Sequence, residues 1–118
     1  MPPKILERSF DFGVAVIRMV QRLPPSTASQ VLGRQLLRSA TSIAANVEEA
    51  QAAVSRADFG NKMGIALKEA RETHLWLRFI RATGLTTPRS IEPLLDEADQ
   101  IRRILGSISK KITPFSNR

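Results

Sequence analysis

The chain has 118 residues, the size of one domain, and 42% of them are hydrophobic, which is enough for one packed core. It has no cysteine, so disulfides, thiolate metal sites and a cysteine nucleophile are excluded. The net charge of +7 favours anionic partners, of which nucleic acid is the commonest, although an arginine-rich surface without such a partner has the same composition.

The first helix is predicted at 4–23, before Pro24 and Pro25 end it. Two apolar stripes run along this segment at steps of three and four residues. The stripe with the spacing of a bundle seam contains Leu6, Phe10, Gly13, Ile17 and Val20. The second stripe contains Phe12, Val16, Met19 and Leu23. Gly13 indicates close approach of another helix, because a glycine inside a helix otherwise costs stability.

The second helix is predicted at 27–53, with Thr27 as its N-cap and Gln30 as the capping-box partner. Its apolar stripe contains Leu32, Leu36, Ile43, Val47 and Ala50. Asn46 lies among these apolar positions, so we expect its side chain to be hydrogen-bonded and to fix the register of the helices.

The third and fourth helices are predicted at 56–83 and 88–112. Ser55 and Asp58 form a cap pair before the third helix, and Gly84 with Leu85 gives it a Schellman ending. The fourth begins at Thr87-Pro88 and carries a continuous apolar heptad. With short links, these four segments predict an all-α protein, an antiparallel up-down-up-down four-helix bundle that forms a single domain over residues 1–118.

Positive charge gathers in the second half of the fourth helix, after its acids. Acids at the start and bases at the end of a helix interact favourably with the helix dipole, which is one interpretation of this order. The second interpretation is a surface that neutralises phosphates. In the second interpretation, the nucleic-acid contacts are Arg102, Arg103, Lys110 and Lys111, followed by Lys62, Lys68 and Arg81. No base-reading motif is present, so we expect binding that does not depend on base sequence.

The sequence predicts no catalytic, cofactor-binding or metal-binding residues. His74 is the only histidine, and Arg71 stands where a Glu-x-x-His metal motif needs glutamate. Glu72 lies on another side of the helix from His74. The charged residues in the middle of the second and third helices are interpreted as an internal network that sets register. Its predicted members are Asn46, Glu49, Glu69, Arg71 and Glu72.

Three stretches resemble the bacterial four-helix bundle family, also called large-subunit ribosomal RNA intervening-sequence proteins. They are QLLRSATSIAANVEEA (35–50), SRADFGNKMGIALKEARET (55–73) and HLWLRFI (74–80), and the ending LDEADQIRRILGSISKK (95–111) is similar. The family's Asn-x-x-Glu-Gly pattern maps to Asn46, Glu49 and Ala50, where alanine replaces the glycine. The family's Glu-Ala-Arg-Glu-Thr stretch maps to 69–73.

The resemblance implies a ring, typically a homopentamer, and similar bundles serve as accessory proteins of reverse transcriptases and bind nucleic acid. The second apolar stripes fit such a ring. We therefore expect a non-enzymatic, cytoplasmic, homo-oligomeric protein that binds RNA or DNA and needs no membrane and no cofactor. The alternative is a scaffold or accessory subunit that docks on a nucleic-acid enzyme.

Overall fold

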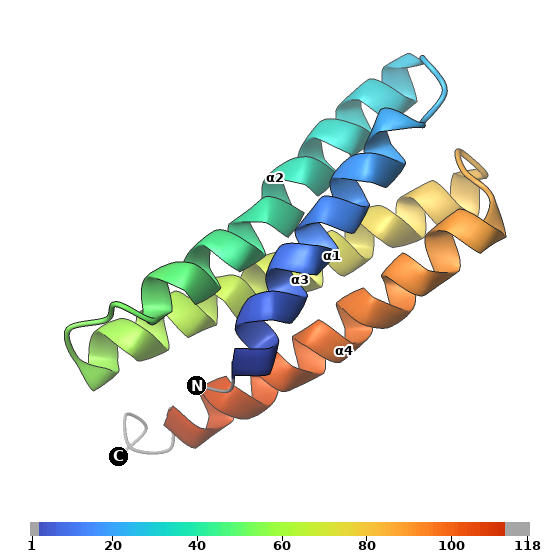
Figure 1. Cartoon of the computed structure of the whole chain (residues 1–118). Coiled ribbons are helices and arrows are strands. Elements are labelled where there is room, and N and C mark those ends of the chain that lie inside the picture. The colour runs from blue at the N-terminus through green and yellow to red at the C-terminus, as the bar shows by residue number, and fades with distance from the viewer. Residues whose placement is uncertain (1–2, 113–118) are drawn as a thin grey trace.

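Four antiparallel helices form a bundle (Figure 1). The computed structural model describes residues 3–112, which contain α1 (Pro3–Gln21), α2 (Thr27–Ala50), α3 (Arg56–Thr83) and α4 (Pro88–Ile112), and no strand. Helices that follow one another in the chain pack together, and α1 also packs against α4. Helices α1 and α3 therefore lie diagonally across an elongated bundle of 47 × 24 × 22 Å. The predicted up-down-up-down bundle is confirmed.

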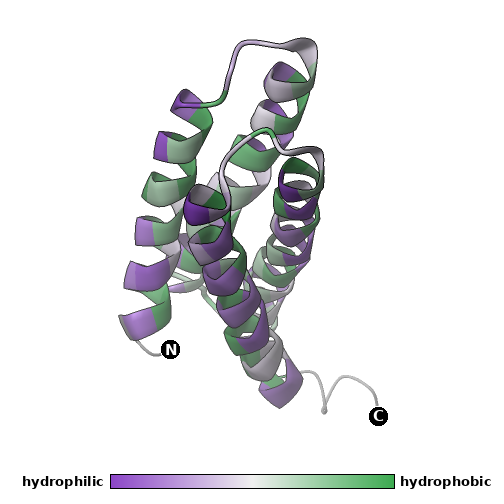
Figure 2. Ribbon diagram, turned by 90° about the vertical axis from the view of Figure 1, so that its right-hand side faces the viewer, coloured by the Kyte–Doolittle hydropathy of each residue, from purple (hydrophilic) through white to green (hydrophobic). Residues whose placement is uncertain are grey.

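The core follows the predicted apolar stripe of α2 and the predicted heptad of α4. Apolar residues recur along every helix (Figure 2), and those that face inward are buried. On α4 the buried positions are Ile91, Leu94, Leu95, Ala98, Ile101 and Leu105. None of the helices within residues 3–112 has the length and continuous apolar character that a bilayer crossing requires.

The inward face of α1 differs from the predicted seam. Phe10 of that stripe is 62% exposed and Ile17 is also exposed, whereas Phe12, Val16 and Met19 of the second stripe are buried. The second stripe continues towards the start of the helix through Ile5 and Ser9, both buried. Ser9 is polar but donates its hydroxyl hydrogen to the Leu6 carbonyl at 3.1 Å, which lets it occupy a core position.

Both predicted ends of α3 and the predicted start of α4 are confirmed, because local caps define them. Ser55 Oγ accepts the Asp58 N–H at 2.9 Å. At the other end Gly84 has φ 67°, and the Leu85 N–H bonds the Ile80 carbonyl at 3.3 Å. Thr87 Oγ1 accepts the Ser90 N–H at the start of α4.

The predicted ends of α1 and α2 need correction. Ser26, not Thr27, is the N-cap of α2 and accepts the Ser29 N–H at 3.0 Å. Helices α1 and α2 end at Gln21 and Ala50, before the predicted 23 and 53. The residues that follow form i→i−3 hydrogen bonds, which tighten the last turn and end the α-helix.

Close helix approach occurs at other glycines than the one predicted. A Cβ atom added at Gly13 would meet nothing within 4 Å, so the prediction for Gly13 is wrong within this bundle. A Cβ at Gly33 would lie 3.2 Å from Val20 Cγ1, and one at Gly60 would lie 2.9 Å from Ile112 Cγ2. A residue larger than glycine would fit at either position only if the neighbouring side chain moved.

Candidate nucleic-acid interface

The two arginines predicted as leading nucleic-acid contacts share one acid on their own helix. Arg102 and Arg103 pair with the two carboxylate oxygens of Asp99 at 2.5 and 3.0 Å. The hydrogen bond from Arg102, followed by the charges of Arg103 and Arg102, lowers the pKa of Asp99. One positive charge of the two is thus compensated within the molecule.

The other predicted bases fall into two groups. Lys62 pairs with Glu49 at 3.0 Å, and Arg81 pairs with Glu92 at 3.4 Å. The hydrogen bond with Glu49 raises the pKa of Lys62. The remaining predicted bases, Lys68, Lys110 and Lys111, are exposed and form no ion pair with any residue in 3–112.

The positive charge is concentrated at one end of the bundle, where the α1–α2 and α3–α4 links lie side by side (Figure 1). We call this the arginine end and define it as residues 14–34 and 76–95. It contains a single acid, Glu92, and six arginines: Arg18, Arg22, Arg34, Arg78, Arg81 and Arg89. They come from all four helices and from the link between α1 and α2.

The rest of the bundle is nearly balanced. The middle of the four helices, residues 11–13, 35–42, 64–75 and 96–104, holds five bases and six acids. The opposite end, residues 3–10, 43–63 and 105–112, holds six bases and four acids. Within the described part of the chain, the field that attracts an anion is therefore strongest at the arginine end.

A charged cluster joins the middle of α2 and α3. Arg38 bridges Glu69 and Glu72, and its Nη1 lies 3.3 Å from Glu69 Oε1. Trp76 Nε1 donates to Glu72 at 3.2 Å, and the buried Thr73 hydroxyl donates to Ser39 Oγ at 2.8 Å. The Trp76–Glu72 bond lies within α3, whereas the contacts of Arg38 with the glutamates and of Thr73 with Ser39 cross between the two helices and hold them in one register.

The structure brings together only part of the predicted network. Glu69 and Glu72 share a partner, but that partner is Arg38, whereas Arg71 is exposed. Glu49 lies elsewhere and pairs with Lys62. Asn46 is half-buried and donates to the Ser42 carbonyl of its own helix at 2.8 Å, so this bond does not fix register between helices. Arg38 has no signal of its own in the sequence, because its partners lie on another helix and depend on how α2 and α3 align.

His74 faces α4 and not the two glutamates. Burial, and next the positive charge of Arg78, lower its pKa, and the charge of Asp99 on α4 opposes this shift. Its imidazole is therefore neutral at pH 7. Within residues 3–112 no group of three histidine, cysteine or acidic residues is placed to hold a metal ion.

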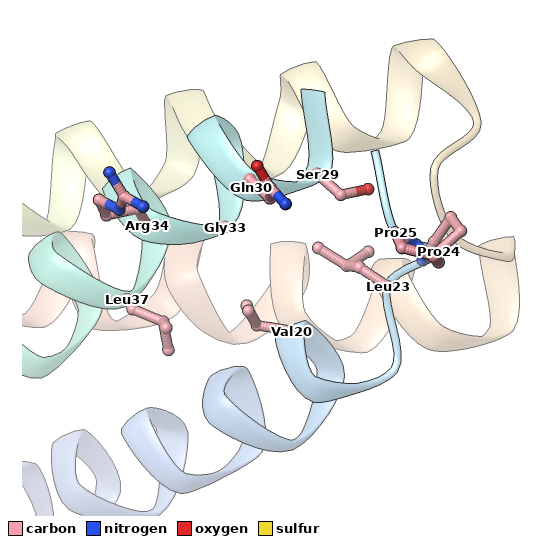
Figure 3. A pocket seen from close by; sticks show the side chains of 9 residues that line it. All are labelled: Val20, Leu23, Pro24, Pro25, Ser29, Gln30, Gly33, Arg34 and Leu37. Atoms are coloured by element: carbon pink, nitrogen blue, oxygen red, sulfur yellow. The ribbon is translucent and has the colours of Figure 1, made fainter. Parts of the chain in front are cut away.

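A groove of about 430 Å³ opens between the end of α1 and the start of α2 (Figure 3). Its walls are mainly apolar and come from Val20, Leu23, Pro24, Pro25, Gly33 and Leu37. Arg34 and the two prolines lie at opposite ends of it (Figure 3). The buried hydroxyl oxygen of Ser29 lines the same groove and has no hydrogen-bond partner in the described structure.

Two exposed apolar patches lie on diagonal helices. Phe10 and Ile17 form the patch on α1, and Leu75 and Phe79 form the patch on α3. Because α1 and α3 are diagonal, the two patches face away from each other. A monomer leaves both patches in water.

Residues 3–107 match the family described as 23S rRNA-intervening sequence protein. A solved structure from Bacteroides thetaiotaomicron, described as a protein of unknown function from the S23 ribosomal protein family, is 40% identical to this chain. Its TM-score is 0.83, and the match covers 90% of this chain and 98% of the other. No curated protein matches the chain. The resemblance found in the sequence is confirmed.

Proposed function

Because this chain belongs to the family of 23S rRNA-intervening sequence proteins, we propose that it is a non-enzymatic, homo-oligomeric bundle that binds RNA or DNA through backbone phosphates. The observation that carries the proposal is the arginine end, where six arginines accompany one acid. Guanidinium groups bind phosphate oxygens well, and each contact releases counterions from the nucleic acid.

The arginine end replaces part of the contact surface expected from the sequence. Arg81 belongs to it and pairs with its one acid, Glu92, whereas Lys62 pairs with Glu49, and Arg102 and Arg103 share Asp99. Lys68, Lys110 and Lys111 remain available as secondary contacts. The proposal requires no base readout, so RNA and DNA of different sequences bind alike.

A shift titration of single-stranded RNA and DNA at two salt concentrations tests this proposal. If about five phosphates are neutralised, affinity falls about 100-fold between about 50 and 200 mM salt. Binding that does not change with salt would contradict it, as would the absence of binding at low salt.

We propose a homopentameric ring as the form that binds. A contact between the α1 patch of one copy and the α3 patch of the next would be heterologous, and repetition of such a contact closes a ring when the rotation allows. Light scattering of nuclease-treated protein should then give about five times the 13.1 kDa of one chain. A monomer would remove the support for the ring.

The second candidate is an accessory subunit that docks on a nucleic-acid enzyme such as a reverse transcriptase. The apolar groove between α1 and α2 favours this candidate, because it lies beside Arg34 and is open to a partner side chain (Figure 3). An oligomer without salt-sensitive nucleic-acid binding would favour the accessory subunit over the first candidate.

A further inference from the structure

A second groove lies within the arginine end, between the last turn of α1 and the first turn of α4. It has a volume of about 290 Å³. Arg18 lines it from the last turn of α1, Arg22 from the residue that follows this helix, and Arg89 and Ser90 from α4. The Arg22 N–H bonds the Met19 carbonyl at 3.0 Å, so the chain is still turning tightly where Arg22 joins Arg18 at the groove. The groove floor is apolar, because buried Met19 and Leu94 contribute to it.

The three guanidinium groups have no acid to compensate them. Arg18, Arg22 and Arg89 are exposed, and none forms an ion pair within residues 3–112. Glu92, the one acid of the arginine end, is paired with Arg81. Three positive charges around one groove repel one another, and an anion between them removes that repulsion.

The position of Arg89 is a separate indication. Arg18 lies in the last turn of α1, where the helix dipole favours a cation. Arg89 lies in the first turn of α4, where the dipole disfavours a cation, and that turn contains no acid. Dipole matching therefore explains Arg18 but not Arg89. An anion in the groove would interact favourably with the N-terminus of α4 and with Arg89 together.

We infer that the groove between α1 and α4 is a phosphate-binding site, in which Arg18, Arg22 and Arg89 hold one phosphate group from two sides. The inference rests on the proposed nucleic-acid binding and names the site that anchors the strand. Arginine is suited to this task because its planar fork donates two parallel hydrogen bonds to phosphate oxygens. The phosphate is either a terminal monoester or an internal diester of the strand.

Direct phosphate binding is tested without nucleic acid. Inorganic phosphate is titrated into the full chain, and the arginine Nε–Hε signals are followed by NMR. The groove variant is Arg22→Gln/Arg89→Gln, and the control is Lys4→Gln/Arg71→Gln, which removes the same charge from exposed positions outside the arginine end. We expect saturable shifts of the three groove signals in the wild type and the control, and none in the groove variant. Unshifted groove signals in the wild type would overturn the site.

RNA binding is then compared in the same three proteins, with oligonucleotides that carry a 5′-phosphate or a 5′-hydroxyl. We expect the groove variant to lose at least about tenfold more affinity than the control. A preference for the 5′-phosphate that the groove variant lacks assigns the site to a terminal phosphate. Equal affinity for both ends, also lost in the groove variant, assigns it to an internal diester.

The two proposals can fail separately. Equal losses in the groove variant and the control would overturn the groove as the anchor, while general binding to nucleic acid would stand. Saturable phosphate shifts in a wild-type protein that binds no RNA or DNA would support the groove and contradict the proposed function.

Discussion

Replacement of Arg38 tests how much the buried carboxylate of Glu69 depends on its partner. The Glu69 side chain is only 11% exposed, whereas the Arg38 side chain is 48% exposed. Removing one partner of a fully buried pair costs about 3–5 kcal/mol, and an exposed pair is worth about 0–1 kcal/mol. Because only the carboxylate is buried here, we expect Arg38→Met to lower the free energy of unfolding by about 1–2 kcal/mol.

The chain offers a matched control in Arg81→Met. Arg81 is 47% exposed, almost the same as Arg38, but its partner Glu92 is 53% exposed. The two substitutions therefore remove equally exposed arginines, and they differ in the burial of the acid left behind and in the second pair of Arg38, with Glu72. We expect Arg81→Met to cost less than about 0.5 kcal/mol.

Urea unfolding at pH 7 measures both variants, with light scattering in parallel because association adds to apparent stability. The double variant Arg38→Met/Glu69→Gln should recover part of the loss, since it removes the buried charge that Arg38→Met leaves without its partner. If Arg38→Met costs no more than Arg81→Met, the cluster between α2 and α3 contributes no more than a surface pair. The cluster would then not hold the two helices in register.

Three further predictions concern α3, the oligomer and pH. Gly64→Ala should stabilise the protein by about 0.5–1 kcal/mol in urea unfolding, because an added Cβ meets nothing within 4 Å and glycine is a poor helix former. Phe10→Ser should lower the mass measured by light scattering while leaving the helical circular dichroism unchanged, because this side chain is exposed in the single bundle; an unchanged mass would exclude the α1 patch from the interface. The pKa of His74 is lowered in the folded state, so the unfolded chain binds its proton first as pH falls below about 6.5. Stability should therefore fall as pH drops through the folded pKa, and the fall should be smaller in His74→Gln; equal pH dependence in both proteins would contradict this assignment.

The helix ends that the sequence predicts correctly are those with a local cap. Ser55 with Asp58 and Gly84 with Leu85 determine their ends through contacts between residues a few positions apart. The inward face of α1 could not be chosen in this way, because both of its stripes have bundle spacing. The buried stripe contains Ser9, and because serine is polar, the apolar pattern is interrupted at this position. Tertiary packing against α2 and α4 decides that face.

Part of the charge pattern was available in the sequence. Arg102 and Arg103 follow Asp99 by three and four residues, a spacing that itself predicts pairing on a helix. The partnership of Arg38 with Glu69 and Glu72 depends on the alignment of two antiparallel helices, and no pattern within one helix contains it.

The arginine end could be located from the sequence together with the predicted topology. A sum of charge over consecutive segments divides its six arginines among four helices and one link, so no segment stands out. The predicted up-down topology already places the end of α1, the start of α2, the end of α3 and the start of α4 together. Grouping the charges by end of the bundle, and not by position in the chain, separates six arginines and one acid from a nearly balanced remainder. The groove between Arg22 and Arg89 needs more, because its shape depends on how closely α1 packs against α4. A predicted topology can thus locate a charged surface, whereas a binding site within it requires the packed side chains.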